Sequence, residues 1–209
     1  MAAPVFVAAD FKVFDVKGFR PRMSEIRARI RPKLEAFGHC LALDIGRSTG
    51  AEAFVHVARH ARRTVNPPDD TWVAFCADAR GYKKHAHFKV AVSRQCVRFL
   101  FEIGPEHADK KHVAAAWKKS AGKLGPVIRR VNGLAWFKNE HDDEPEAMLG
   151  DITPEGFAGL ADELMRTRDG QLVLGRAVPA AEAARWKEAQ YRTAALETFR
   201  ALAPLYRLQ

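Results

Sequence analysis

The chain has 209 residues and carries 34 Lys and Arg side chains against 25 Asp and Glu side chains, which gives a formal charge of +9 at pH 7. Hydrophobic residues make up 47% of the chain, enough for a core, and this excludes an intrinsically disordered protein. The apolar stretches, such as 97–103, are far shorter than the ~20 residues of a spanning helix, so a membrane protein is not expected.

The N-terminal segment, residues 1–14, contains Asp10 and Lys12 and has no long apolar run, so it does not resemble a signal peptide. The chain has 3 cysteines without a CxxC spacing, which predicts neither a disulfide framework nor a zinc ribbon. A cytoplasmic protein is therefore expected.

A helical period begins at Pro21 and continues for about twenty residues. Its apolar positions recur at steps of three and four and form one stripe: Met23, Ile26, Ile30, Leu34, Phe37 and Leu41. Pro32 has no N–H group to donate, so we expect it to kink or split this helix. Gly46 and Gly50 are expected to end it.

The next part of the chain predicts an antiparallel sheet. Residues 53–60 fit either a strand or a helical turn, and the Asn-Pro-Pro-Asp sequence within 64–70 predicts an ordered loop. A strand follows over 71–77. Residues 85–93 and 97–103 alternate apolar with polar side chains and are separated by a short turn, which predicts a hairpin. Such strands would give the sheet one apolar face and one polar, solvated face.

The remaining chain alternates helices with short strands. We expect a helix over 106–122, one or two strands within 127–137, a solvated acidic loop over 140–146, a helix capped by Thr153, a strand over 171–176 and a helix from 180 to 202. An antiparallel sheet with segregated helices predicts an α+β fold in which the sheet is packed on one face by helices.

The charges are unevenly distributed. Residues 1–139 hold 26 basic and 12 acidic side chains, for +14, whereas residues 140–209 hold 8 and 13, for −5. The densest basic stretch is 59–98, with 9 basic and 3 acidic side chains. This asymmetry indicates either a polyanionic partner or a fold in which the acidic part screens the basic part.

Two basic segments, 60–72 and 80–87, contain the candidate ligand-binding residues. These are His60, Arg62, Arg63, Asn66, Trp72, Arg80, Tyr82, Lys83, His85 and His87. Arginine presents a rigid fork of donors that suits phosphate or carboxylate, and Trp and Tyr rings can stack on a base. We therefore expect these segments to bind an anionic small molecule or nucleic acid. An equally weighted interpretation is that these two segments form a solvated rim whose basic side chains pair with acidic residues near the end of the chain.

Three further alternatives follow from the same residues. His60 or His87 could act as a general base on an anionic substrate in a small metal-independent hydrolase or transferase. The basic face could instead bind an acidic protein partner, and the acidic run 142–144 could fold back to add a carboxylate to the site. No metal site or cofactor is expected, because the HVARH sequence 56–60 lacks the Glu of the helical zinc motif and no phosphate-binding loop is present.

The segment 56–75, followed by 80–88, resembles the YktB-like family of uncharacterised bacterial proteins. The early residues from Asp10-Phe11 to Leu34 and the ending 202–206 fit the same pattern. The resemblance spans nearly the whole chain and implies a single α+β domain over residues 1–209. It implies no activity, so the expected function rests on side-chain chemistry.

Overall fold

A computed structural model describes residues 3–61 and 63–209. Within these residues, the strands form one antiparallel sheet in the order β1-β2-β3-β4-β7-β5-β6. The strands are β1 (Phe54–Val57), β2 (Asp70–Cys76), β3 (His87–Ser93), β4 (Cys96–Ile103), β5 (Ala135–Phe137), β6 (Ala147–Met148) and β7 (Leu172–Pro179). The first four strands form a meander, and β7 then pairs with β4 on one side and β5 on the other.

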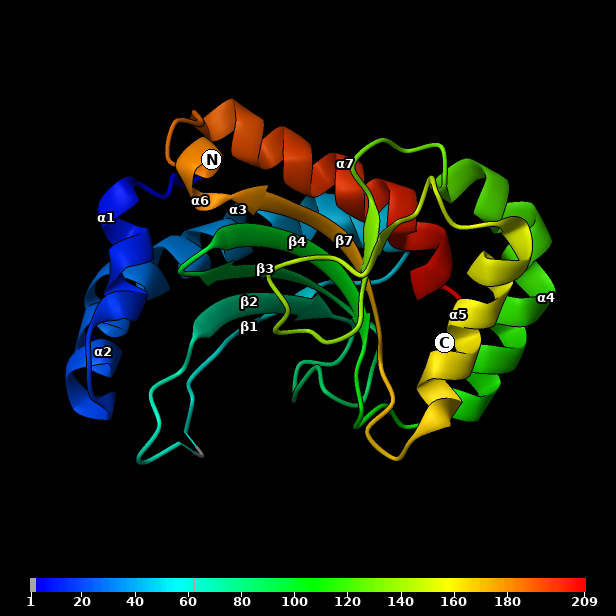
Figure 1. The fold of residues 1–209 in the computed structure, drawn as a ribbon, viewed down its shortest axis with the longest axis horizontal. Helices are drawn as coiled ribbons and strands as arrows, with labels where there is room; N and C mark the ends of the chain where they lie inside the picture. The colour runs from blue at the N-terminus through cyan, green and yellow to red at the C-terminus, as the bar shows by residue number, and fades with distance from the viewer. Residues whose placement is uncertain (1–2, 62) are drawn as a thin grey trace.

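Helices cover one face and one end of the sheet (Figure 1). They are α1 (Ala8–Phe11), the 3-10 helix η1 (Lys12–Asp15), α2 (Phe19–Glu25), the π-helix η2 (Ile26–Ile30), α3 (Arg31–Thr49), α4 (Lys110–Ile128), α5 (Pro154–Arg166), α6 (Ala180–Ala183) and α7 (Glu188–Tyr206). Helices α3 and α7 lie along the sheet, and α4 pairs with α5 at its end. This arrangement confirms the α+β fold. In the described part of the chain, no helix has the length and hydropathy needed to cross a membrane.

The helix is irregular next to Pro32, as expected, but residues 19–49 stay helical throughout. The π-turn η2 immediately precedes α3, in which Pro32 lies in the first turn. The apolar stripe of this helix is buried. The helix ends at Gly50, whose φ of 81° is the left-handed conformation that glycine adopts at low cost. Gly46 lies inside the helix and does not end it.

The predicted hairpin of β3 and β4 is present, with Phe88 opposite Phe101 and Val92 opposite Val97. These side chains face α7, and Phe88 lies 4.9 Å from Phe199 between ring centroids. The expectation of a solvated opposite face is wrong, because every residue of β3 and β4 is buried. The cover on that face is the chain after β5, as described below.

Several expected boundaries also shift. Helix α4 starts at Lys110, where the Asp109 side chain accepts a hydrogen bond from the His112 amide at 2.8 Å, and it continues past Gly122 to Ile128. The expected strand at 127 is therefore helical. The predicted cap of α5 is confirmed, since Thr153 Oγ1 accepts from the Gly156 amide at 3.0 Å. The last helix is divided into α6 and α7.

Candidate functional site

The sheet face opposite α3 and α7 carries a buried group of charged side chains. Lys89 on β3 and Glu102 on β4 are 1% and 2% exposed, and Lys89 Nζ lies 2.5 Å from Glu102 Oε2. His87 Nε2 lies 3.2 Å from the same oxygen. His87 Nδ1 is 2.9 Å from the backbone oxygen of His85, which can only accept, so Nδ1 carries a hydrogen. The imidazole is thereby held with Nε2 directed at a carboxylate.

Opposite charges outweigh burial in this group. Burial acts to raise the pKa of Glu102, but the charges of Lys89 and His87 and their hydrogen bonds hold that pKa well below its usual range. Burial likewise acts to lower the pKa of Lys89, yet Glu102 and Glu140 raise it. Both groups are therefore ionised at neutral pH.

The acidic segment, residues 138–146, covers this face. Glu140 forms an ion pair with Lys89, and Arg98 on β4, which is fully buried, donates from Nη1 to the backbone oxygens of Glu140 at 2.9 Å and Asp142 at 2.8 Å. The loop is solvated in part, since residues 141 and 144–146 are exposed, and Glu140 folds back onto the basic face, which corresponds to the alternative of a returning carboxylate. Buried cations need counter-charges and acceptors, and the acidic segment supplies both.

A second ion pair fixes the acidic segment to β2. Asp70 Oδ2 accepts from Arg98 Nη2 at 2.6 Å, and Asp70 Oδ1 lies 3.0 Å from Nδ1 of His141. Burial acts to raise the pKa of Asp70, but the hydrogen bond from His141 and the charge of Arg98 lower it. The pKa of His141 is raised, first by its hydrogen bond to Asp70. His141 keeps 43% of its side chain exposed.

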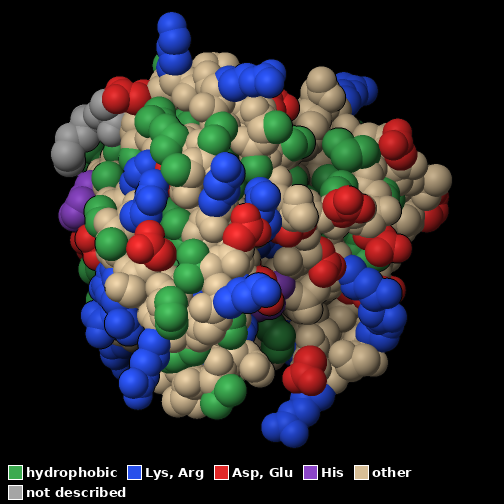
Figure 2. Space-filling view, turned by 60° about the vertical axis from the view of Figure 1, so that its left-hand side comes forward, with side chains coloured by type: hydrophobic (Ala, Val, Ile, Leu, Met, Phe, Trp, Pro, Cys, Tyr) green, Lys and Arg blue, Asp and Glu red, His purple; other side chains and the backbone are tan. Residues whose placement is uncertain are grey.

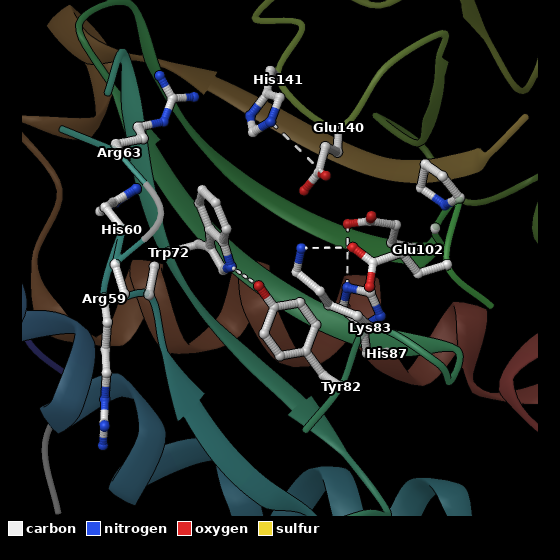
Figure 3. A pocket seen from close by; sticks show the side chains of 15 residues that line it. Arg59, His60, Arg63, Trp72, Tyr82, Lys83, His87, Glu102, Glu140 and His141 are labelled. Carbon is white, nitrogen blue, oxygen red and sulfur yellow. Dashed lines mark hydrogen bonds and ion pairs between the residues drawn. The ribbon is translucent and has the colours of Figure 1, made fainter. Parts of the chain in front are cut away.

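A cleft of about 420 Å³ opens beside this buried network. Trp72 on β2 and Tyr82 form an aromatic wall of the cleft. The two side chains are joined by a hydrogen bond, in which Trp72 Nε1 donates to the Tyr82 hydroxyl at 2.9 Å (Figure 3). The charged and aromatic residues that line the cleft are Arg59, His60, Arg63, Trp72, Tyr82, Lys83, His87, Glu102, Glu106, Glu140 and His141. Figure 2 shows a hollow with a histidine inside it, with Lys and Arg side chains gathered at its lower left and Asp and Glu side chains at its right.

Two arginines at the mouth of the cleft have no acidic partner among the residues that the structure describes. Arg59 and Arg63 are exposed and line the cleft, and no ion pair joins either to a described carboxylate. Lys83, in contrast, pairs with Glu106 at 2.9 Å. The available positive charge of the cleft therefore lies on the segment that follows β1.

A neighbouring hollow of about 740 Å³ shares Arg59, Tyr82, Lys83 and Glu106 with the cleft. Arg80 and His85 line only this second hollow, and both pair with Asp78, at 3.1 and 3.2 Å. The Arg80 charge is therefore already matched within its own loop.

Comparison with known proteins places the chain in a family. A family model described as "Domain of unknown function (DUF1054)" matches residues 6–206. The chain belongs to this family. Proteins named "UPF0637 protein" from Macrococcus caseolyticus and Bacillus licheniformis are 32% and 31% identical to it, over 96% and 100% of this chain and 97% of each relative. A relative with the same name from Bacillus thuringiensis is 32% identical over 100% of this chain and 99% of its own length. The resemblance to an uncharacterised bacterial family is thus confirmed.

In this DUF1054 chain, the predicted site residues fall into four groups. The cleft contains His60, Arg63, Trp72, Tyr82, Lys83 and His87. Arg80 and His85 lie in the neighbouring hollow. Asn66 is exposed on the loop before β2 and lines neither space. Arg62 lies outside the described residues.

Sequence reasoning missed Arg59, Glu102, Glu106 and Glu140 as lining residues, and it assigned His141 to a solvated loop. The available signal was the charge imbalance, since an excess of cations in 59–98 requires carboxylates from elsewhere in the chain. The alternation of apolar and polar residues in 85–93 and 97–103 concealed this signal, because the polar side of such strands is usually solvated.

Metal and thiol chemistry have no further support in the described chain. In residues 3–61 and 63–209, no group of three or more His, Cys, Asp or Glu side chains is placed to hold a metal ion. Cys76 and Cys96 are buried, and burial raises the pKa of the Cys96 thiol to about 12. Neither is therefore suited to act as a nucleophile.

Proposed function

We propose that the protein binds a small molecule that carries both a phosphate group and a planar ring, of the size of a nucleotide, in the cleft beside Trp72. The observation that carries the proposal is the pair Arg59 and Arg63, two exposed cations without described acidic partners at the mouth of an aromatic cleft. A free arginine fork can form two charge-assisted hydrogen bonds to a phosphate.

The lining suits a ring as well as an anion. Trp72 and Tyr82 present aromatic surface, and the Trp72 indole N–H is already satisfied because it donates to the Tyr82 hydroxyl. A planar ligand that packs on the exposed part of these rings therefore leaves the indole N–H paired. The volume of about 420 Å³ falls within the ~300–1,000 Å³ that small-molecule sites occupy.

The acidic side chains of the cleft are compatible with an anionic ligand because each of them pairs with a lysine. Glu102 and Glu140 share Lys89, and Glu106 pairs with Lys83. Their negative charge is partly cancelled at short range, whereas the charges of Arg59 and Arg63 project into solvent. A phosphate at the mouth can therefore pair with these two arginines.

The test is equilibrium binding of ribonucleoside mono-, di- and triphosphates and of the matching nucleosides, by calorimetry at low and high salt. Replacing both arginines, Arg59→Ala with Arg63→Ala, should weaken nucleotide binding at least about tenfold, because a hydrogen bond to a charged group contributes ~1.5–3 kcal/mol. Arg27→Ala is the matched control, since Arg27 is an exposed arginine on η2 and lines neither the cleft nor the neighbouring hollow.

Binding should also weaken as salt is raised, because exposed charges are screened. Absence of binding by every nucleotide, or equal affinity for nucleosides and nucleotides, would contradict the proposal. Capture of an acidic protein in the absence of nucleotide binding would favour the interaction-domain alternative.

A further inference from the structure

His141 has the surroundings of a proton-transfer group. Its Nδ1 lies 3.0 and 3.1 Å from the two oxygens of Asp70, so Nδ1 carries the hydrogen. Its Nε2, which lies 3.8 Å from Glu140 Oε1, is the nitrogen that can exchange a proton in the cleft. A buried carboxylate that orients an exposed imidazole in this way fixes its tautomer and stabilises its protonated form. Nothing in the residues around His141 predicts such a role.

Asp70 is itself held rigidly. Its side chain is 7% exposed, and Arg98 Nη2, fully buried, donates to it at 2.6 Å. Arg98 also binds the backbone of the acidic segment that carries His141. The pair of Asp70 and His141, here called the Asp70–His141 dyad, is therefore anchored to β2, which carries Asp70, and to β4, which carries Arg98.

A second imidazole lies in the same cleft. His60 and His141 each lie against the Trp72 ring, with ring centroids 5.3 and 5.8 Å from it, and Figure 3 shows Trp72 between them. His60 Nε2 is 3.0 Å from the hydroxyl oxygen of Thr71, so in the tautomer in which Nε2 donates, Nδ1 carries the free lone pair. His60 has a φ of 49°, which non-glycine residues adopt rarely and often at functional sites.

The two imidazoles have opposite environments. Burial lowers the pKa of His60 to about 4, with Asp70 opposing and Arg63 and His141 assisting that shift. The hydrogen bond to Asp70 raises the pKa of His141, as do the charges of Asp70 and Glu140, while burial and Lys89 oppose the rise. At neutral pH His60 is therefore a neutral acceptor and His141 is the better proton donor. Such divergent pairs mark the base and the acid of an active site.

We propose that the cleft cleaves RNA by internal transesterification, with His60 as the general base and His141, positioned by Asp70, as the general acid. This rests on the proposed function, because the phosphate is the group held by Arg59 and Arg63. His60 Nδ1 accepts the proton of the ribose 2′-hydroxyl, and that oxygen forms a bond to phosphorus. The bond from phosphorus to the 5′-oxygen breaks, and His141 Nε2 gives its proton to that oxygen. The products are a 2′,3′-cyclic phosphate and a free 5′-hydroxyl.

RNA is the class that this set of side chains fits. Its own 2′-hydroxyl supplies the nucleophile, so two imidazoles complete the proton transfers and no further reactant is needed. Arg59 and Arg63 stand where they can hold the charged phosphate, and Trp72 and Tyr82 offer rings for single-stranded bases.

The experiment uses a labelled single-stranded RNA oligonucleotide and its 2′-O-methyl counterpart, each incubated with the full chain. We expect cleavage of the RNA to a cyclic phosphate end and no cleavage of the 2′-O-methyl strand. His141→Ala and His60→Ala should each slow cleavage at least about 100-fold, the lower end of a general acid or base contribution. His39→Ala is the control, because His39 is an exposed histidine on α3, which covers the opposite face of the sheet.

Two readouts separate catalysis from folding. Added imidazole should restore part of the activity of His141→Ala, which a structural role of His141 would not allow. The rate should fall as pH drops toward the pKa of His60, about 4, and fall again as pH rises through the raised pKa of His141. RNA that binds but is not cleaved would overturn this inference and leave the proposed function standing. RNA that neither binds nor is cleaved would also overturn this inference, and the nucleotide titration then decides the proposed function separately. Equal cleavage by His141→Ala would overturn the assignment of the acid.

Discussion

The buried pair Lys89 and Glu102 predicts a large change in stability from a single substitution. Lys89→Met removes the cation that Glu102 and Glu140 both contact, and it leaves Glu102 buried with only His87 nearby. Breaking a buried ion pair by removing one partner costs about 3–5 kcal/mol. Against a total stability of ~5–15 kcal/mol this is a large fraction. For a chain of this size it should lower the melting temperature by about 6–20 °C.

The compensated variant tests the reason for that loss. Lys89→Met combined with Glu102→Gln removes the unpaired buried charge, so the double variant should be more stable than the single one by at least about 1 kcal/mol. Both would be measured by urea unfolding at pH 7, followed by circular dichroism, with the m-value checked for constancy. Lys118→Met is the control, because Lys118 and its partner Asp162 are 50% and 65% exposed and such pairs contribute at most ~1 kcal/mol. A loss below about 1 kcal/mol for Lys89→Met would refute the reasoning, as would a double variant no more stable than the single one.

Three further predictions concern the same framework. The lowered pKa values of Glu102 and Asp70 stabilise the fold above their unfolded values of about 4, so the free energy of unfolding should fall as pH drops from about 5 to 3, in a urea series at each pH. An acid profile that is flat in wild type would contradict this. Gly175→Ala should destabilise by more than about 2 kcal/mol, because a Cβ there would lie 2.1 Å from the backbone oxygen of Phe99, whereas Gly122→Ala, in an open helical position, should be neutral or stabilising by up to ~1 kcal/mol. Iodoacetamide should label the half-buried Cys40 before Cys96 in the folded protein, as peptide mass spectrometry would show, and faster labelling of Cys96 would contradict its burial.

The sequence was most informative where local pattern decides structure. The helix irregularity beside Pro32, the β3–β4 hairpin and the Thr153 cap each depend on neighbouring residues, and all three are present. Pattern was least informative where a distant segment changes the environment. The polar side of β3 looks solvated in isolation, and only the return of the acidic segment makes Lys89 a buried residue.

The same limit applies to the candidate site. Most of the aromatic and basic lining comes from the segments that the sequence singled out, because a loop and the strands beside it stay close together. Glu140 and His141 come from far along the chain, and nothing local to them indicates a partner at Asp70 or Lys89. Their role follows from the sheet order.

The position of β7 between β4 and β5 has a consequence for the order in which the protein assembles. During synthesis, the acidic segment leaves the ribosome about thirty residues before β7, yet β5 is held in the sheet by its pairing with β7. Until β7 is inserted, we expect Lys89 and Arg98 to remain hydrated and the contact between Asp70 and His141 not to form. Ligand binding in the cleft should therefore arise together with global folding, so a binding assay would also report when the sheet is complete.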